Sequence, residues 1–189
     1  MKLPSSTGHQ ILAGRIKPGR DLKLTLLDIV QSHQLSAGWM VSCVGSLKNA
    51  RLRMAGGIDI LEREGPFEIL SLSGTLGLER LHLHMTLSDN EGRCLGGHLL
   101  DGCKIFTTCE VVLGLSSEIA FTRVQDADTG YGELMVESCK GYKSGFEKCL
   151  STMRSSTRLR RRRRRGNSDQ QMAGETSTSL MRSFLAMAK

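Results

Sequence analysis

The feature that most constrains the fold is a single helical period in a chain that otherwise alternates like β-strands. Leu22, Leu26 and Val30 recur at the spacing of one helix face. Asp21 precedes them at the position where a helix N-cap accepts backbone hydrogen bonds, so the pattern predicts a helix over about 21–34. With one helix among many strands, we expect an α+β fold in which an antiparallel sheet curls around that helix.

Alternation and glycine-rich turns predict about seven antiparallel strands. Eight strand-like segments supply these strands, the short segment 58–61 among them: 9–17, 39–54, 58–61, 67–76, 80–88, 93–100, 105–115 and 118–125. Gly45 lies inside one of them, which indicates a bulge or a close approach of two backbones. Residues 62–66 are expected to form a turn. Strict alternation after that turn places Phe67, Ile69, Ser71, Ser73 and Thr75 on one face, and Glu68, Leu70, Leu72 and Leu76 on the other.

Charge is distributed unevenly along the chain. The net charge is +7, yet residues 1–150 hold 16 Lys+Arg against 17 Asp+Glu, and residues 151–189 hold 10 against 2. The second part contains the block Arg158–Arg165, whose like charges repel one another. It is otherwise polar and cannot bury enough apolar surface to offset its chain entropy. We therefore expect a folded domain over 9–126, an unassigned extension over 127–150, and a disordered basic tail over 151–189.

The six cysteines and the hydropathy of the chain indicate its environment. No two cysteines are spaced C-x-x-C, and no apolar signal segment precedes them. We interpret them as reduced thiols of an intracellular, cytoplasmic protein. Cys43, Cys94, Cys103 and Cys109 are expected to be small core residues. No apolar run approaches the roughly 18 residues that a membrane span requires, so no membrane partner is expected.

Three of the five histidines, His82, His84 and His98, fall within 17 positions. His82 and His84 are two apart on an expected strand, so they share a face. If the hairpin turn is a three-residue loop with Gly92 in the left-handed conformation, Asp89 pairs with Arg93 and His84 lies opposite His98. A four-residue loop would place His98 on the other face.

In the first register, three imidazoles lie within reach of one metal ion. Three histidines with an open fourth position are the ligand arrangement of catalytic zinc, so the predicted ligands are His82, His84 and His98, and the expected ion is zinc. The alternative is a set of polar histidines that hydrogen-bond within a subunit interface or to solvent.

Two carboxylates inside the expected strands, Glu68 and Glu110, are the candidate catalytic residues. One interpretation makes them exposed or ion-paired residues of a strand face. The other makes one of them a general base, or a partner that orients an imidazole. Asp89 and Asp101 are expected to be turn residues.

A series of short motifs runs through the first two thirds of the chain. In order they are Pro18-Gly19-x-Asp21-Leu22, Gly38-Trp39, Val44-Gly45-Ser46-Leu47, Phe67-Glu68-Ile69-Leu70-Ser71-Leu72-Ser73-Gly74-Thr75, His82-Leu83-His84, Ser88-Asp89, Gly96-Gly97-His98-Leu99 and Thr107-Thr108-x-Glu110. This series resembles the PPC domain (plant and prokaryote conserved) over about residues 9–126. The resemblance implies a seven-stranded antiparallel sheet around one helix, assembled as a homotrimer.

The resemblance also implies two kinds of function. In plants the domain follows an AT-hook in nuclear DNA-binding proteins, whereas prokaryotic members stand alone and some look like metal-binding proteins with clustered histidines. No Arg-Gly-Arg-Pro core precedes the domain in this chain. The block Arg158–Arg165 lies on the other side of the domain and lacks the Gly-Arg-Pro that would enter a minor groove.

Three functional hypotheses follow. The first is a stand-alone PPC-type homotrimer that binds a small polar ligand or a partner and carries a three-histidine metal site. The second is a zinc-dependent hydrolase or lyase that acts on a small polar substrate. The third is a nuclear DNA- or chromatin-associated factor, to which Arg158–Arg165 would supply nonspecific affinity for nucleic acid. The expected location is the cytoplasm, with the nucleus as the alternative that the basic tail would direct.

Overall fold

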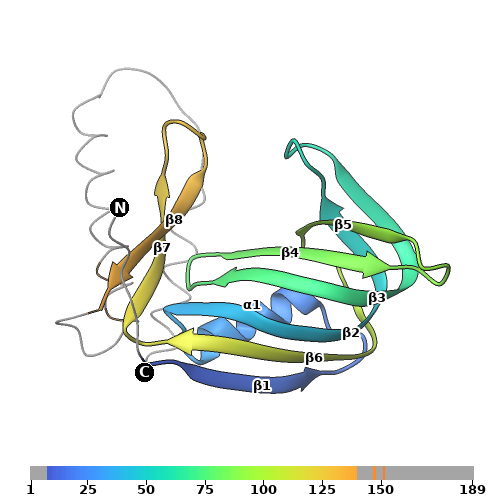
Figure 1. Cartoon of the computed structure of the whole chain (residues 1–189), viewed down its shortest axis with the longest axis horizontal. Helices are drawn as coiled ribbons and strands as arrows, with labels where there is room; N and C mark the ends of the chain where they lie inside the picture. The colour runs from blue at the N-terminus through green and yellow to red at the C-terminus, as the bar shows by residue number, and fades with distance from the viewer. Residues whose placement is uncertain (1–7, 140–146, 148–150, 152–189) are drawn as a thin grey trace, which may run out of the picture. The chain divides into compact units, whose positions relative to one another are not determined.

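A six-stranded antiparallel sheet packed on one helix carries the core of the protein (Figure 1). The computed structural model describes residues 8–139, 147 and 151. Among residues 8–139, α1 is the one helix. The elements in chain order are β1 (Gln10–Ile16), α1 (Leu22–Ser32), β2 (Ala37–Arg53), β3 (Ile60–Leu76), β4 (Leu81–Ser88), β5 (Cys94–Leu99), β6 (Ile105–Ser116), β7 (Ile119–Gln125) and β8 (Gly132–Ser138). The predicted α+β class is confirmed.

The helix forms where the sequence predicts it. The Asp21 carboxylate accepts a hydrogen bond from the Leu24 amide at 2.9 Å and so caps the first turn. Leu22, Leu26 and Val30 are fully buried against the sheet. Burial of each such side chain stabilises the fold by about 1.5–3 kcal/mol, which anchors the helix to the core.

The strand order is β1-β6-β2-β3-β4-β5, and the end of β2 also pairs with β5. In this second contact Leu52 pairs with Leu99, and Arg53 pairs with His98. The strands β2, β3, β4 and β5 therefore close into a ring at one end of the sheet. This closure brings residues that lie 45 positions or more apart in sequence to one place.

The structure corrects the prediction for β3 in two ways. The expected turn at 62–66 is instead part of one continuous strand, which passes through a cis peptide bond before Pro66. The ladder with β4 then shifts register between Ile69 and Ser71. This bulge reverses the alternation, so Phe67 and Ile69 are buried upstream of it, whereas downstream Leu72 is buried and Ser71 is exposed.

The strand count and the expectation of a single sheet also need correction. Eight strands form rather than seven, and they make two sheets in the part of the chain that the structure describes. β7 leaves the main ladder and pairs with β8, a strand within the unassigned 127–150 segment. The expected disordered tail at 151–189 lies outside the described residues, apart from Ser151.

Two smaller predictions concern glycine and cysteine. Gly45 has a φ of 155°, and the β2–β6 register shifts just after it, so the predicted irregularity is confirmed. All five cysteines of the described segment are free thiols. Cys43, Cys103 and Cys109 are buried as expected, but Cys94 is exposed because it begins β5 beside the hairpin turn.

Candidate metal centre

The β4–β5 hairpin sets the positions of the histidines. Gly92 has a φ of 78°, and its amide donates to the Asp89 carbonyl at 3.1 Å. The Asp89 amide donates to the Arg93 carbonyl at 3.0 Å, which closes a three-residue loop. His84 therefore pairs directly with His98, and the register predicted from the Gly92 turn is confirmed.

His82, His84 and His98 form one cluster on the face of β4 opposite to its buried leucines. Their ring centroids lie 5.2–5.4 Å apart in all three pairs. One nitrogen from each ring lies within 4.8 Å of the corresponding nitrogen of the other two. His82 and His84 are exposed, whereas His98 is 7% exposed. The cluster thus combines one buried imidazole, that of His98, with two imidazoles that face solvent.

The surroundings of His82 and His98 lower their pKa values and so favour the neutral imidazole. Burial, reinforced by the nearby Arg53 guanidinium, lowers the pKa of His98 to about 4. Burial also lowers the pKa of His82, and the charge of Arg123 acts in the same direction. A neutral imidazole has a free lone pair, which is the form that binds metal ions. At neutral pH protons therefore compete weakly for these two rings.

The residues present fit a divalent ion. With Zn–N bonds of about 2.0–2.1 Å, the ligand nitrogens of a tetrahedral zinc lie roughly 3.4 Å apart. The ligand nitrogens of the three histidines lie within 4.8 Å of one another. Rotation of the exposed His82 and His84 rings can shorten these nitrogen–nitrogen distances to the value that zinc requires. In addition, the buried Nδ1 of His98 has no hydrogen-bond partner among the described residues. An unpaired buried nitrogen is costly unless an ion or a hydrogen-bond partner binds it.

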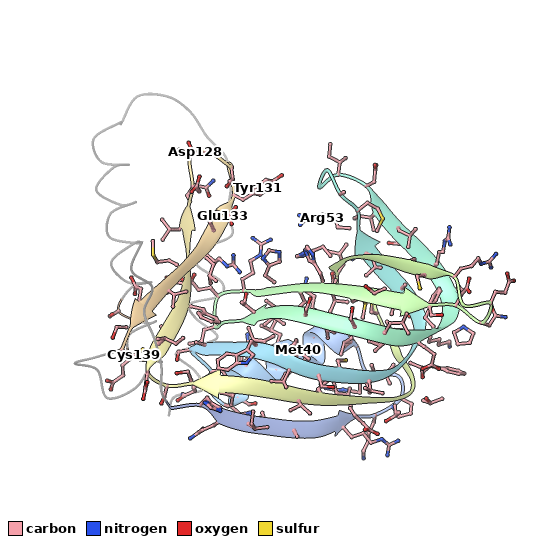
Figure 2. The ribbon with its side chains drawn as sticks, viewed as in Figure 1. Met40, Arg53, Asp128, Tyr131, Glu133 and Cys139 are labelled. Atoms are coloured by element: carbon pink, nitrogen blue, oxygen red, sulfur yellow. The ribbon has the colours of Figure 1, made fainter. Side chains whose placement is uncertain are left out.

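The structure brings three arginines to the cluster that the sequence pattern did not identify. Arg53 pairs with His98 through the closure of β2 onto β5, and Figure 2 labels it on β2. Arg123 on β7 donates from Nη2 to Thr75 Oγ1 at 3.3 Å, and Thr75 pairs directly with His82. The charge of Arg80 lowers the pKa of both His82 and Arg123. Arg53 and Arg123 reach the site through tertiary pairing, which no local spacing signals, whereas Arg80 lies two residues before His82 in the sequence.

The two carboxylate candidates do not join the cluster. Glu68 is exposed and pairs with Ser88, four residues along β4 from His84. Four strand residues span about 13 Å, which excludes direct contact with an imidazole in this register. Glu110 is exposed on β6 and pairs with Val44 of β2, so it lies in a different part of the sheet. Their proposed role in catalysis therefore has no geometric support at the histidines.

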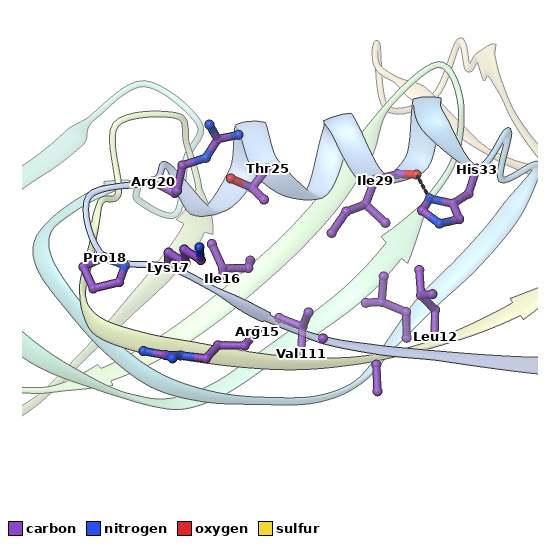
Figure 3. Close-up of a pocket in the computed structure, with 13 residues that line it drawn as sticks. Leu12, Arg15, Ile16, Lys17, Pro18, Arg20, Thr25, Ile29, His33 and Val111 are labelled. Atoms are coloured by element: carbon purple, nitrogen blue, oxygen red, sulfur yellow. Dashed lines mark hydrogen bonds between the residues drawn. The ribbon is translucent and has the colours of Figure 1, made fainter.

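A separate cavity lies between β1 and α1, away from the histidine cluster (Figure 3). It has a volume of about 630 Å³, and apolar side chains such as Leu12, Ile29 and Val111 line it. At one end the ring of His33 donates from Nδ1 to the Ile29 carbonyl at 3.1 Å. His33 is the one imidazole of the cavity wall, so this space offers no set of ligands comparable to the histidine cluster.

Comparisons with solved structures place the fold among known proteins. A hypothetical protein from Salmonella enterica is 40% identical, with a TM-score of 0.69 over 71% of this chain and 97% of the other. A metal-containing protein from Archaeoglobus fulgidus, AF0104, is 27% identical, with a TM-score of 0.60 over 71% and 99%. A candidate DNA-binding protein from Bacteroides thetaiotaomicron matches in fold alone, at 22% identity and a TM-score of 0.59 over 70% and 94%.

Among curated sequences, the chain is similar to part of two much longer proteins. Each is a bifunctional protein GlmU from a Synechococcus strain. They are 45% identical over 135 residues in strain JA-3-3Ab and 44% identical over 129 residues in strain JA-2-3B'a(2-13). These matches cover 71% and 67% of this chain, but the chain spans only about a fifth of the length of either relative.

The described residues contain no helix that is both long and apolar enough to cross a membrane.

A family model for the Plants and Prokaryotes Conserved domain matches residues 4–117, more than half of the chain. This span includes the helix, the six-stranded sheet and all three clustered histidines. The chain therefore belongs to the Plants and Prokaryotes Conserved (PCC) domain family, the same domain as the PPC domain of the sequence motifs.

Proposed function

We propose that this protein is a homotrimeric binding module that holds a divalent ion, zinc, on His82, His84 and His98 and binds a small polar ligand beside it. The observation that carries the proposal is the convergence of three imidazoles, one of them buried, within 4.8 Å of one another. Three protein nitrogens leave one position of a tetrahedral ion open to a ligand. A similar protein from Archaeoglobus fulgidus is described as metal-containing, which supports a metal at this fold.

The trimer rests on apolar surface that the described chain leaves uncovered. Val44 is 61% exposed and Leu70 is 54% exposed, and they flank the paired residues Gly45 and Ile69 of neighbouring strands. Adjacent exposed aliphatic side chains on one sheet face are typical of an interface with another subunit. Leu70 lies on β3, within the segment 67–76 that we expect at the subunit interface, and Val44 lies beside it on β2.

A second candidate function uses the same ligand set. An ion held by three neutral imidazoles lowers the pKa of a bound water, so the site would suit a zinc-dependent hydrolase or lyase. A nuclear DNA- or chromatin-associated role would depend on Arg158–Arg165, which lie outside the described residues. The candidate DNA-binding protein shares the fold at 22% identity, and this likeness assigns no DNA-binding residue among those that the structure describes. A cytoplasmic location accompanies the binding function in our proposal.

Elemental analysis of the purified protein tests the metal site. We expect about one zinc per chain, and its loss in His84→Ala. His33→Ala is the matched control, since His33 is an exposed histidine outside the cluster. Its zinc content should equal that of the wild type. A wild-type protein that purifies without metal and binds no added zinc at pH 7 would refute the proposal.

A further inference from the structure

The histidine cluster is bordered by guanidinium groups from two directions. On one side, Arg53 is the direct register partner of His98. On the other side, Arg123 is anchored by its hydrogen bond to Thr75, the register partner of His82. The cluster therefore lies between arginines that come from β2 and from β7.

These arginines are not neutralised by ion pairs. The ion pairs found among the described residues are Arg20–Asp28, Arg51–Glu62, Arg51–Asp101, Arg93–Asp89 and Arg93–Glu91. None of them involves Arg53, Arg80 or Arg123. Glu133 and Glu79 are the carboxylates whose charge acts on Arg123, and neither forms an ion pair with its guanidinium. The Glu79 carboxylate instead accepts a hydrogen bond from the Arg123 backbone amide at 2.9 Å. The surroundings of the cluster thus carry excess positive charge.

The environment of Arg123 agrees with this excess of positive charge. The pKa of Arg123 is lowered, first by burial and then by the charge of Arg80. Two guanidinium groups held near each other, one of them half-buried, repel and lose solvation without compensation. An anion bound between the charges would relieve this repulsion and form charge-assisted hydrogen bonds with the guanidinium groups.

We propose that the arginines around the histidine cluster recognise the oxyanion, a carboxylate or a phosphate, of a small ligand. The inference rests on the proposed function, because it identifies the ligand class of the same site. The planar guanidinium presents its donors in a fork that matches two oxygens of either group. Arg123 keeps its remaining donors after the bond to Thr75, and Arg53 approaches from the side of His98.

Isothermal titration calorimetry with inorganic phosphate and with succinate tests the inference. Comparison of the two affinities shows whether the site prefers a phosphate or a carboxylate. We expect Arg53→Gln and Arg123→Gln each to weaken binding of the preferred anion at least tenfold, while zinc content stays unchanged. Arg123→Lys, which keeps the charge but not the fork, should fall between wild type and Arg123→Gln. Arg20→Gln is the matched control, since Arg20 is an exposed arginine paired with Asp28 and should change affinity less than twofold.

The outcomes distinguish this inference from the metal proposal. If zinc binds but both glutamine variants bind the anion as the wild type does, the oxyanion inference alone is overturned. Zinc-loaded wild type that binds neither phosphate nor succinate overturns it as well. If no zinc binds and yet anion affinity falls in both variants, the oxyanion site stands and the metal proposal fails. A short DNA duplex that displaces phosphate with the same arginine dependence would overturn the assignment to a small ligand.

Discussion

Gly74 gives the sharpest test of how β3 and β4 hold the histidine cluster. Its φ is 139°, a conformation that residues with a side chain rarely adopt, and it pairs with Leu83. A Cβ at this position would overlap the carbonyl oxygen of His82. We expect Gly74→Ala to cost about 1–3 kcal/mol in backbone strain. Displacement of β4 would weaken one or two ladder hydrogen bonds at ~1 kcal/mol each, for a total loss of about 2–5 kcal/mol in the free energy of unfolding.

Gly14→Ala is the matched control for this substitution. Gly14 also lies in a strand, β1, but a Cβ there meets no atom within 4 Å because it faces the cavity between β1 and α1. This substitution should change stability by less than about 1 kcal/mol and in the stabilising direction. Urea denaturation with linear extrapolation measures both variants. The argument is refuted if Gly74→Ala lies within 1 kcal/mol of the wild type, or if Gly14→Ala loses as much as Gly74→Ala.

Two further predictions concern the pH dependence of stability and the assembly state. Burial holds the pKa of His98 at about 4 in the folded chain, below its ordinary value of 6.5. Between these values the unfolded chain binds the extra proton, so metal-free protein should lose about 2 kcal/mol of stability as pH falls from 6.5 to 4. His98→Asn should flatten this dependence in pH-stepped urea melts, and an equal slope in wild type and variant would contradict it. For assembly, Val44→Glu with Leu70→Glu should convert a trimer to a monomer by light scattering, whereas Val124→Glu, at a 48% exposed site outside this face, should not. A wild type that is monomeric at micromolar concentration would rule the trimer out.

The sequence predicts those parts of the site that depend on local geometry. A left-handed glycine at position 92 fixes the hairpin loop, and the loop fixes which residues face each other across β4 and β5. The same local reasoning locates the cap at Asp21 and the irregularity at Gly45. In each case the controlling residues lie within a few positions of the feature they determine.

The sequence does not predict features that depend on how distant strands meet. Nothing near Leu70 signals the bulge in β3, since it arises from the combined register of β3 with its neighbours. Likewise Arg53 and Arg123 reach the histidines only because β2 closes onto β5 and β7 lies beside Thr75. The pairing of β7 with β8 was missed for a similar reason, because the weak alternation of 132–138 becomes a strand only in contact with its partner.

The closure of β2 onto β5 has a consequence for the order in which the protein folds. The isolated β4–β5 hairpin contains all three histidines and is a local unit that can form on the microsecond scale. The pairing of Arg53 with His98 joins residues 45 positions apart, and it follows the assembly of β3 and β4 between them. Because such nonlocal contacts form slowly, the histidines should come together early, and Arg53 should join them late. A nascent chain would then present its three imidazoles to solvent before the surface that selects among ligands exists.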